Sequence, residues 1–339
     1  MYKLFKLLNK FLILAILLGL VVLGIVSSSD AAPRQSQNSV APDGRSVQKL
    51  LDEARSHYRK GRYGEAKPLL EGAVELSKKL FGPFHPETAT CLNELANLYR
   101  TQGNFAASED LFKQALIIRE KSFGPDHAAV GESLNSLAVL YKSQAMYSKA
   151  EPLYKRSLAI IEKSLGPGHP HLSAGLNNLA NLYYAQGKYE KAEPLHRRSL
   201  EIRESSLGPD HPRVATSLNN LANVYSTQGK YSDAEPLYKR ALLIAKKQMG
   251  PEHPFVATSM NSLARLYFAQ GKYDEAEPLL REALSIREKS LGSEHPAVGR
   301  SLNSLAVIYF LQGRYQEAEP LVKRAKAIKA MHDKEPSAR

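Results

Sequence analysis

Asparagine recurs at one position of a 42-residue repeat. An Asn side chain carries N–H donors and a carbonyl acceptor, so a row of them can bond the backbone of an extended peptide whatever its side chains. The same amides can instead bond a neighbouring helix and set how the repeats stack. The main row is Asn93, Asn135, Asn177, Asn219, Asn261 and Asn303, and it is joined by Asn97, Asn181 and Asn223.

Two neighbouring positions vary from copy to copy and would give such a row its specificity. They hold charged or polar residues in the early copies and more apolar residues in the last copies. This gradient predicts a ligand with acidic or polar residues at one end and an apolar anchor at the other. One position holds Arg100, Lys142, Tyr184, Ser226, Phe268 and Phe310, and the other holds Asn97, Val139, Asn181, Asn223, Arg265 and Val307.

Histidine also recurs every 42 residues, from His85 to His295, and could suggest a metal site. Packed helices lie roughly 8–10 Å apart, so neighbouring copies hold their imidazoles too far apart. A metal ion needs ligands that converge within about 2 Å of it. We therefore expect no metal and no cofactor, and we interpret each His as structuring the turn before a proline.

Catalytic patterns are missing from the sequence. It contains no Gly-rich phosphate loop, no His-Glu-x-x-His and no Gly-x-Ser-x-Gly, and the repeat accounts for its recurrent polar residues. We expect no catalytic residues and no enzyme. The single cysteine, Cys91, occupies a position that holds serine in related copies, so we interpret it as a small packing residue.

Two helices must position these side chains in each copy. In the fourth copy Leu176, Leu179 and Tyr183 share one helical face, and Asn177 and Tyr184 lie on the opposite stripe. The pattern breaks at Gly187, which suits a helix end that needs a positive φ. A second apolar face follows from Ala192 to Leu207.

The ends of the second helix carry their own signals. Ser148, Ser232 and Asp274 follow the tyrosine of the turn and predict N-terminal caps. A proline recurs just after them, as in Pro152, and we expect it in the first helical turn, where it costs little. Gly-Pro-x-His-Pro elements then end the second helix.

These elements resemble tetratricopeptide repeats of the 42-residue kinesin light chain type. The shared motifs are Leu-Asn-x-Leu-Ala-x-x-Tyr, Gln-Gly-x-Tyr, x-Ala-Glu-Pro-Leu and Gly-Pro-x-His-Pro, over about Ser46 to His332. The resemblance implies an all-α, right-handed superhelical solenoid of stacked helix-turn-helix repeats. It also implies that the first helices line a concave groove, where Asn side chains contact bound peptides.

Departures from the pattern limit what the resemblance implies. The first copy, around Val47 to Leu80, is weak and resembles a terminal cap, and the third copy has Ala145 where others have Gly. No sustained heptads lie outside the repeats, so a motor role does not carry over.

The N-terminus has the pattern of an export signal, with lysines, an apolar run from Phe11 to Val26 and small residues up to Ala31. As a helix the run is about 24 Å long. This is slightly longer than the apolar part of a signal peptide and slightly shorter than a membrane span. We expect residues 1–31 to be a signal peptide or anchor, 32–45 a flexible linker, 46–332 about seven repeats and 333–339 a disordered tail. Either alternative places the repeats outside the cytoplasm, with a periplasm as the working hypothesis and membrane contact only through an uncleaved anchor.

The formal net charge is +12, which could indicate nucleic acid. Basic residues on the second helices alternate with Glu, however, and favour solvated ion-paired faces. We expect a non-enzymatic scaffold that binds a protein or an extended peptide and no nucleic acid. The alternative is a self-associating structural scaffold of a membrane-associated complex.

Overall fold

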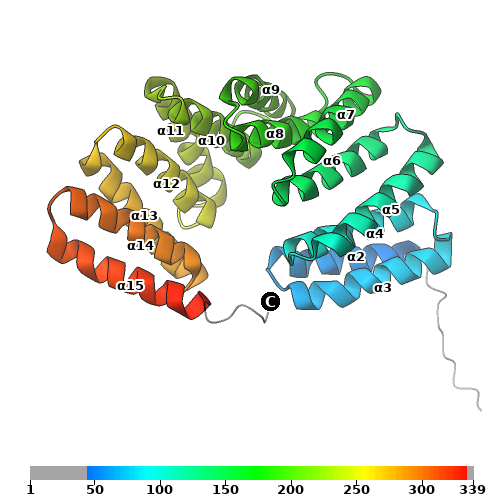
Figure 1. The fold of residues 1–339 in the computed structure, drawn as a ribbon, viewed down its shortest axis with the longest axis horizontal. Coiled ribbons are helices and arrows are strands. Elements are labelled where there is room, and N and C mark those ends of the chain that lie inside the picture. Colours follow the sequence, from blue (N-terminus) through cyan, green and yellow to red (C-terminus); the bar gives the residue numbers. More distant parts are fainter. Residues whose placement is uncertain (1–43, 334–339) are drawn as a thin grey trace, which may run out of the picture. The chain divides into compact units, whose positions relative to one another are not determined.

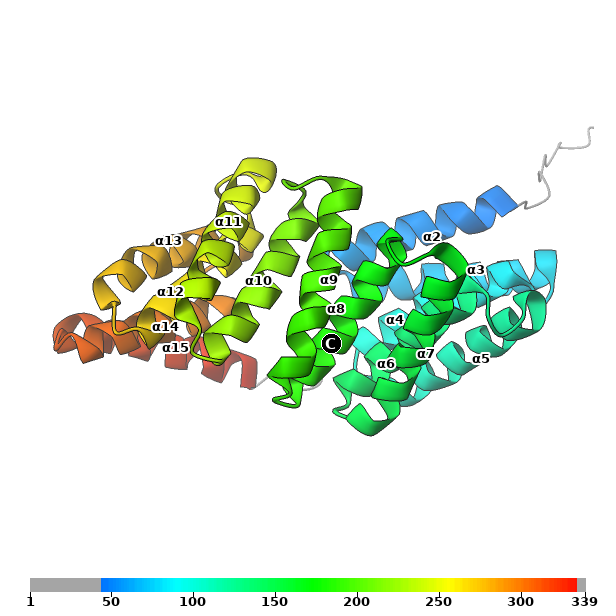
Figure 2. The same ribbon diagram turned by 90° about the horizontal axis from the view of Figure 1, so that it is seen from above.

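A computed structural model describes residues 44–333, and the expected signal or anchor, linker and tail lie mainly outside this range. Its fourteen helices form seven antiparallel pairs, which follow one another side by side (Figures 1 and 2). The first helices are α2 (Gly44–Arg59), α4 (Pro86–Thr101), α6 (Ala128–Ser143), α8 (Pro170–Ala185), α10 (Pro212–Thr227), α12 (Pro254–Ala269) and α14 (Pro296–Leu311). The second helices are α3 (Tyr63–Phe81), α5 (Phe105–Phe123), α7 (Tyr147–Leu165), α9 (Tyr189–Leu207), α11 (Tyr231–Met249), α13 (Tyr273–Leu291) and α15 (Tyr315–Asp333).

The expected all-α solenoid is confirmed. Each second helix packs against the first helix of its own pair and against the first helix of the next pair. First helices of neighbouring repeats also approach one another, whereas neighbouring second helices are farther apart. The first helices therefore form the inner layer of the stack.

Alanines make the close approach possible. Ala138, Ala180 and Ala222 in the first helices are fully buried, as are Ala150 and Ala192 in the second helices. Apolar side chains from both helices and from the next repeat surround them, as Leu176 and Leu179 do in the cluster around Ala180. A single pair cannot enclose these faces, so the core is continuous only when pairs stack.

A glycine with positive φ shapes the turn between the two helices of a repeat, as in the fourth repeat. Gly187 has φ +72°, its N–H donates to the carbonyl of Tyr184, and the N–H of Lys188 donates to that of Tyr183. This pattern closes α8 and is confirmed as expected from the sequence. The second helices from α3 to α13 likewise end at a positive-φ glycine, such as Gly208 after α9.

The expectations for the start of the second helix were wrong. The helix begins at the tyrosine itself, so Ser148 lies inside it, and Met146 at the cap position makes no side-chain cap bond. The N–H of Ala150 already donates to the carbonyl of Met146, so Pro152 lies in the second turn and removes one helical hydrogen bond. Among the second helices from α3 to α13, only α5 has a side-chain cap, in which Asn104 accepts from the N–H of Ala107.

No helix in residues 44–333 has the length and apolar character needed to cross a membrane.

Ala145 is the one non-glycine residue with positive φ in the described range, at φ 57°. An L residue in this conformation costs roughly 1–2 kcal/mol. We expect Ala145→Gly to raise the free energy of unfolding by about 1 kcal/mol, measured by urea denaturation.

Gly187→Ala is the matched control, because a Cβ there meets no atom within 4 Å and only backbone strain is added. It should lower stability by a similar amount. Equal stability of all three proteins would contradict a left-handed turn residue at these positions.

Candidate binding face on the first helices

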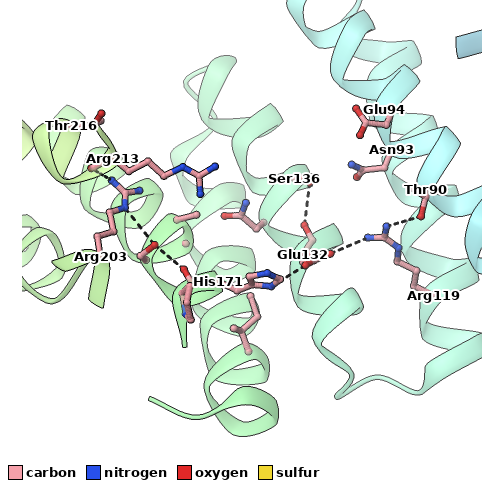
Figure 3. A pocket seen from close by; sticks show the side chains of 16 residues that line it. Thr90, Asn93, Glu94, Arg119, Glu132, Ser136, His171, Arg203, Arg213 and Thr216 are labelled. Atoms are coloured by element: carbon pink, nitrogen blue, oxygen red, sulfur yellow. Dashed lines mark hydrogen bonds and ion pairs between the residues drawn. The ribbon is translucent and has the colours of Figure 1, made fainter. Parts of the chain in front are cut away.

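A hollow of about 660 Å³ opens on the inner layer of α4, α6, α8 and α10 (Figure 3). Arg119 and Arg203 reach it from the second helices α5 and α9, and lie at opposite ends of the view with Glu132 and His171 between them. Its lining residues are Thr90, Asn93, Glu94, Arg119, Glu132, Asn135, Ser136, Ile161, Pro170, His171, Ser173, Ala174, Gly175, Arg203, Arg213 and Thr216.

Hydrogen bonds fix the guanidinium group of Arg203. Its Nη1 donates to Ser217 Oγ at 2.8 Å and to the carbonyl of Arg213 at 3.1 Å, and its Nε lies 3.4 Å from Ser173 Oγ. The side chain is buried, with 9% of the residue exposed. Arg119 repeats this arrangement, donating to Ser133 Oγ at 3.0 Å.

The charge of Arg203 is not compensated. Burial lowers the pKa of its guanidinium, and Arg213 adds to the effect. Arg119 has Glu132 at 4.0 Å, but no carboxylate in the described residues forms an ion pair with Arg203. Arg203 therefore presents a partly desolvated positive charge to the hollow.

Many other basic residues of the second helices do have carboxylate partners. Lys155 pairs with Glu151 at 2.7 Å, and Arg240 pairs with Glu204 at 2.6 Å. The ion-paired outer faces expected from the sequence are thus present. The four helices α8, α10, α12 and α14 contain no Asp or Glu. Their basic residues Arg213, Arg265 and Arg300 form no ion pair within the described range.

Several Asn side chains of the predicted row bond the fold itself. The Oδ1 of Asn177 accepts from Asn220 Nδ2 at 2.8 Å, which ties α8 to α10, and Asn135 accepts from Asn178 in the same way. The stacking role is therefore directly visible for these two amides.

Other amides in the two rows combine internal bonds with unused acceptors. Asn223 Oδ1 accepts from Tyr238, Asn97 donates to the carbonyl of Asn93, and Asn219 donates to Ser259. The amide of Asn261 faces the guanidinium of Arg287. The Oδ1 atoms of Asn93 and Asn219 are buried without a partner. Asn181 is half-buried, and Asn303 is exposed.

The variable row changes in character along the stack. Arg100 Nε is buried without a hydrogen-bond partner, and burial lowers the pKa of the Lys142 ammonium. Tyr184 shares a hydrogen bond with Thr227 at 2.8 Å. Phe268 and Phe310 are 39% and 60% exposed, and Arg265 is exposed.

The histidine row caps the first helices. In His85 the Nδ1 atom accepts the backbone N–H of Glu87 at 3.2 Å, and the other five copies repeat this bond. The sequence indicated a turn-structuring role but not this cap. In the described residues, no group of three or more His, Cys, Asp or Glu side chains is placed to hold a metal ion.

Sequence reasoning missed a row of arginines, of which Arg119 and Arg203 are buried and Arg287 is half-buried. They lie 84 residues apart, and the copies between them hold Ile161 and Ala245. A signal was present, because arginine alternates with apolar residues at a position on the packed side of the second helix. A search for residues that recur every 42 positions finds those common to all copies. It does not find an arginine that recurs only in every second copy.

Comparisons with known proteins identify the family. A tetratricopeptide repeat model matches residues 47–121, 93–163, 133–205 and 255–330, and the Nephrocystin-3 TPR domain model matches residues 197–291. These matches cover well over half of the chain, which therefore belongs to the tetratricopeptide repeat family. Neither model describes a catalytic domain.

Solved structures agree with the kinesin light chain type of repeat. A crystal structure of a single-substitution variant of a putative kinesin light chain from Podosopora anserina is 30% identical, with a TM-score of 0.54 over 61% of this chain and 97% of that chain. BtubC (BKLC) from P. vanneervenii is 27% identical, with a TM-score of 0.58 over 70% and 94%. A Rap protein complexed with competence and sporulation factor, at 17% identity and a TM-score of 0.62 over 84% of this chain and 75% of that chain, shares the fold alone. No match was found among curated proteins.

His196 in α9 is buried near the cationic Arg203 and Lys142. Burial first, and then these two charges, lower its pKa to about 4. Its Nδ1 has no hydrogen-bond partner, and 1% of the residue is exposed. The neutral imidazole is therefore the form that the fold accepts.

The unfolded chain should protonate His196 near pH 6.5, before the folded chain does. Stability then falls as the pH drops from about 6.5 to 4, by roughly 3 kcal/mol in total from this group. We expect His196→Tyr to flatten this part of the curve, because Tyr154 and Tyr238 occupy the same repeat position. Urea denaturation at several pH values would test this, and parallel curves for the two proteins would contradict it.

Proposed function

We propose that the inner layer of this repeat protein binds an extended, acidic segment of a partner protein. The observation that carries the proposal is the buried and uncompensated Arg203 guanidinium at the edge of the hollow. A buried cation is costly when no anion balances it. A carboxylate of the ligand would supply that balance and gain charge-assisted hydrogen bonds.

The Asn side chains that line the hollow support an extended backbone as the ligand. Asn93 and Asn135 reach it from successive first helices, and each amide carries both N–H donors and a carbonyl acceptor. A peptide backbone offers an N–H donor at each non-proline residue, and the donors on one edge of an extended strand recur about every 7 Å. Acceptors along successive first helices could therefore hold the ligand without reading its side chains.

The apolar anchor has a candidate site farther along the array. A smaller hollow of about 300 Å³ lies between the sixth and seventh repeats and is lined by Ala264, Phe268, Leu280 and Val307 among others. Arg265 also lines it, so the cationic character continues beside the apolar floor. This arrangement suits a ligand whose acidic residues flank one apolar side chain.

An array of twelve-residue peptides tests the charge preference. Peptides with Glu should bind more tightly than peptides of the same length and order that carry Gln, and Lys should weaken binding further. Binding should also weaken as salt is added. Equal binding of the Glu and Gln series would refute the proposal, and binding of single-stranded DNA in preference to acidic peptides would favour the nucleic-acid alternative.

Substitutions locate the site on the inner layer. Arg203→Met should weaken the best acidic peptide about tenfold or more, since hydrogen bonds to charged groups contribute roughly 1.5–3 kcal/mol. Arg213→Gln, at an exposed position on the rim, should weaken binding without affecting the fold. Arg240→Gln on α11 is the matched control and should change the affinity less than twofold, with circular dichroism confirming that all variants fold. Equal losses for Arg240→Gln and Arg213→Gln would place the site elsewhere.

A further inference from the structure

The repeats are joined by a recurring contact at the end of each first helix. In five of the six junctions, a tyrosine of the incoming first helix donates its hydroxyl to a glutamate of the preceding second helix. In the sixth, Arg281 Nε donates to Tyr309 at 2.7 Å. The five pairs are Tyr99–Glu71 at 3.1 Å, Tyr141–Glu109 at 2.8 Å, Tyr183–Glu151 at 2.9 Å, Tyr225–Glu193 at 3.1 Å and Tyr267–Glu235 at 3.1 Å.

In every junction after the first, a basic residue four positions after the glutamate completes the receiving side. Lys155 pairs with Glu151 at 2.7 Å, and Arg281 pairs with Glu277 at 2.7 Å. The apolar part of the junction lies beside this pair. In the last junction, α14 contributes Leu305, Ile308 and Tyr309 to a cluster with the small and apolar residues Ala264, Ala276 and Leu280.

The seventh repeat keeps the receiving side of the junction, and no helix of residues 44–333 packs on it. Its residues Ala306, Ala318, Glu319, Val322 and Lys323 stand 42 positions after their counterparts in the sixth repeat. They line a hollow of about 730 Å³. Within residues 44–333, the side chains of Glu319 and Lys323 have no ion pair or hydrogen bond.

Large apolar side chains are exposed around this hollow. Phe310 and Tyr315 line it and are each 60% exposed, and Val307 is 47% exposed. The sequence predicted Phe310 as part of the peptide groove, and the structure places it at this open junction. After α15 the chain also leaves the repeat pattern, since Lys334 stands where the preceding copy has Gly292.

A second copy of this chain does not offer a matching first helix. In α4, Cys91 and Leu95 are buried against the preceding repeat. The corresponding residues of α2 are Lys49 and Glu53, which are exposed and charged. Stacking α2 of one molecule onto the seventh repeat of another would bury these charges in an apolar junction.

We propose that the hollow on α14 and α15 receives an amphipathic helix of a partner protein, in the place that the next first helix takes in every earlier repeat. The helix would present apolar residues at positions i and i+3 and a tyrosine at i+4, with its hydroxyl between Glu319 and Lys323. This surface adjoins the apolar end of the proposed acidic-peptide face at Val307 and does not include the hollow beside Arg203, and the proposal does not depend on that face.

A lysine in the hollow on α14 and α15 indicates that the partner helix is acidic at one position. Lys326 lines the hollow where the sixth repeat has the apolar Leu284, and it has no carboxylate partner in the described residues. Leu284 packs near Leu302 and Leu305 of α14. The partner helix should therefore carry an acidic residue at position i−3, which corresponds to Leu302.

A labelled peptide with the α10 sequence, residues 212–227, provides the probe. Its Leu221, Val224 and Tyr225 supply the required spacing, and a staple joining positions 219 and 223 on the opposite face would offset the low helicity of a short peptide. A second version carries Leu218→Glu at position i−3. Fluorescence anisotropy should show saturable binding of both peptides to the full chain, with the Leu218→Glu version at least fivefold tighter.

Variants of the chain separate the apolar and charged contributions. Val322→Asp should weaken both peptides at least tenfold. Lys326→Glu should weaken only the Leu218→Glu peptide by that amount and change the other less than twofold. Lys163→Glu, at an exposed position on α7, is the charge-matched control and should change neither.

Three results would overturn the proposal. One is the lack of saturable binding by either peptide, and another is binding that Val322→Asp does not weaken. The third is concentration-dependent self-association in sedimentation that Val322→Asp abolishes, because a second copy would then occupy the surface. If Lys326→Glu affected both peptides equally, the proposed pairing of Lys326 with an acidic residue at position i−3 would be wrong.

Discussion

The close contact between small residues on facing helices sets the geometry of the whole stack. Ala180 and Ala192 are fully buried, and their size lets the two helices of one repeat approach until larger apolar side chains interlock around them. Because each pair leaves an apolar side uncovered, the next repeat is required to complete the core. The spacing of the inner rows of side chains follows from this contact, and so does the open junction at the last repeat.

The fold was predictable because it depends on properties that every copy shares. The helical spacing of Leu176, Leu179 and Tyr183 and the glycine at position 187 have only one consistent interpretation, since both reflect local backbone and burial rules. The position of Pro152 relative to the start of its helix was not predictable in the same way. A hairpin turn of three residues and one of five both fit the sequence, and only the hydrogen bond from Ala150 to Met146 shows where the helix begins.

The candidate site was predictable only in outline. The Asn rows lie on the inner layer, as the resemblance implied, but hydrogen bonds such as Asn220 to Asn177 give part of them a stacking role. The two alternatives are not exclusive, because an amide that bonds one neighbour through its oxygen still has N–H donors for a ligand. Arg203 was missed for a different reason. Its importance comes from burial and from the lack of a nearby carboxylate, and neither can be seen in the spacing of residues along the chain.

A repeat protein faces a conflict between regularity and specificity. Identical copies stack well because each junction offers the same contacts, yet identical copies cannot distinguish one ligand from another. This chain places its irregular residues where stacking tolerates them. Arg203 replaces the Ile161 of the preceding copy and satisfies two of its donors within the fold, so it adds charge without breaking the junction. Lys326 replaces Leu284 in the seventh repeat, on a side where no further helix of residues 44–333 packs. A residue that departs from the repeat and lowers the stability of the free protein therefore indicates a binding site. The larger this loss of stability without a ligand, the stronger the indication.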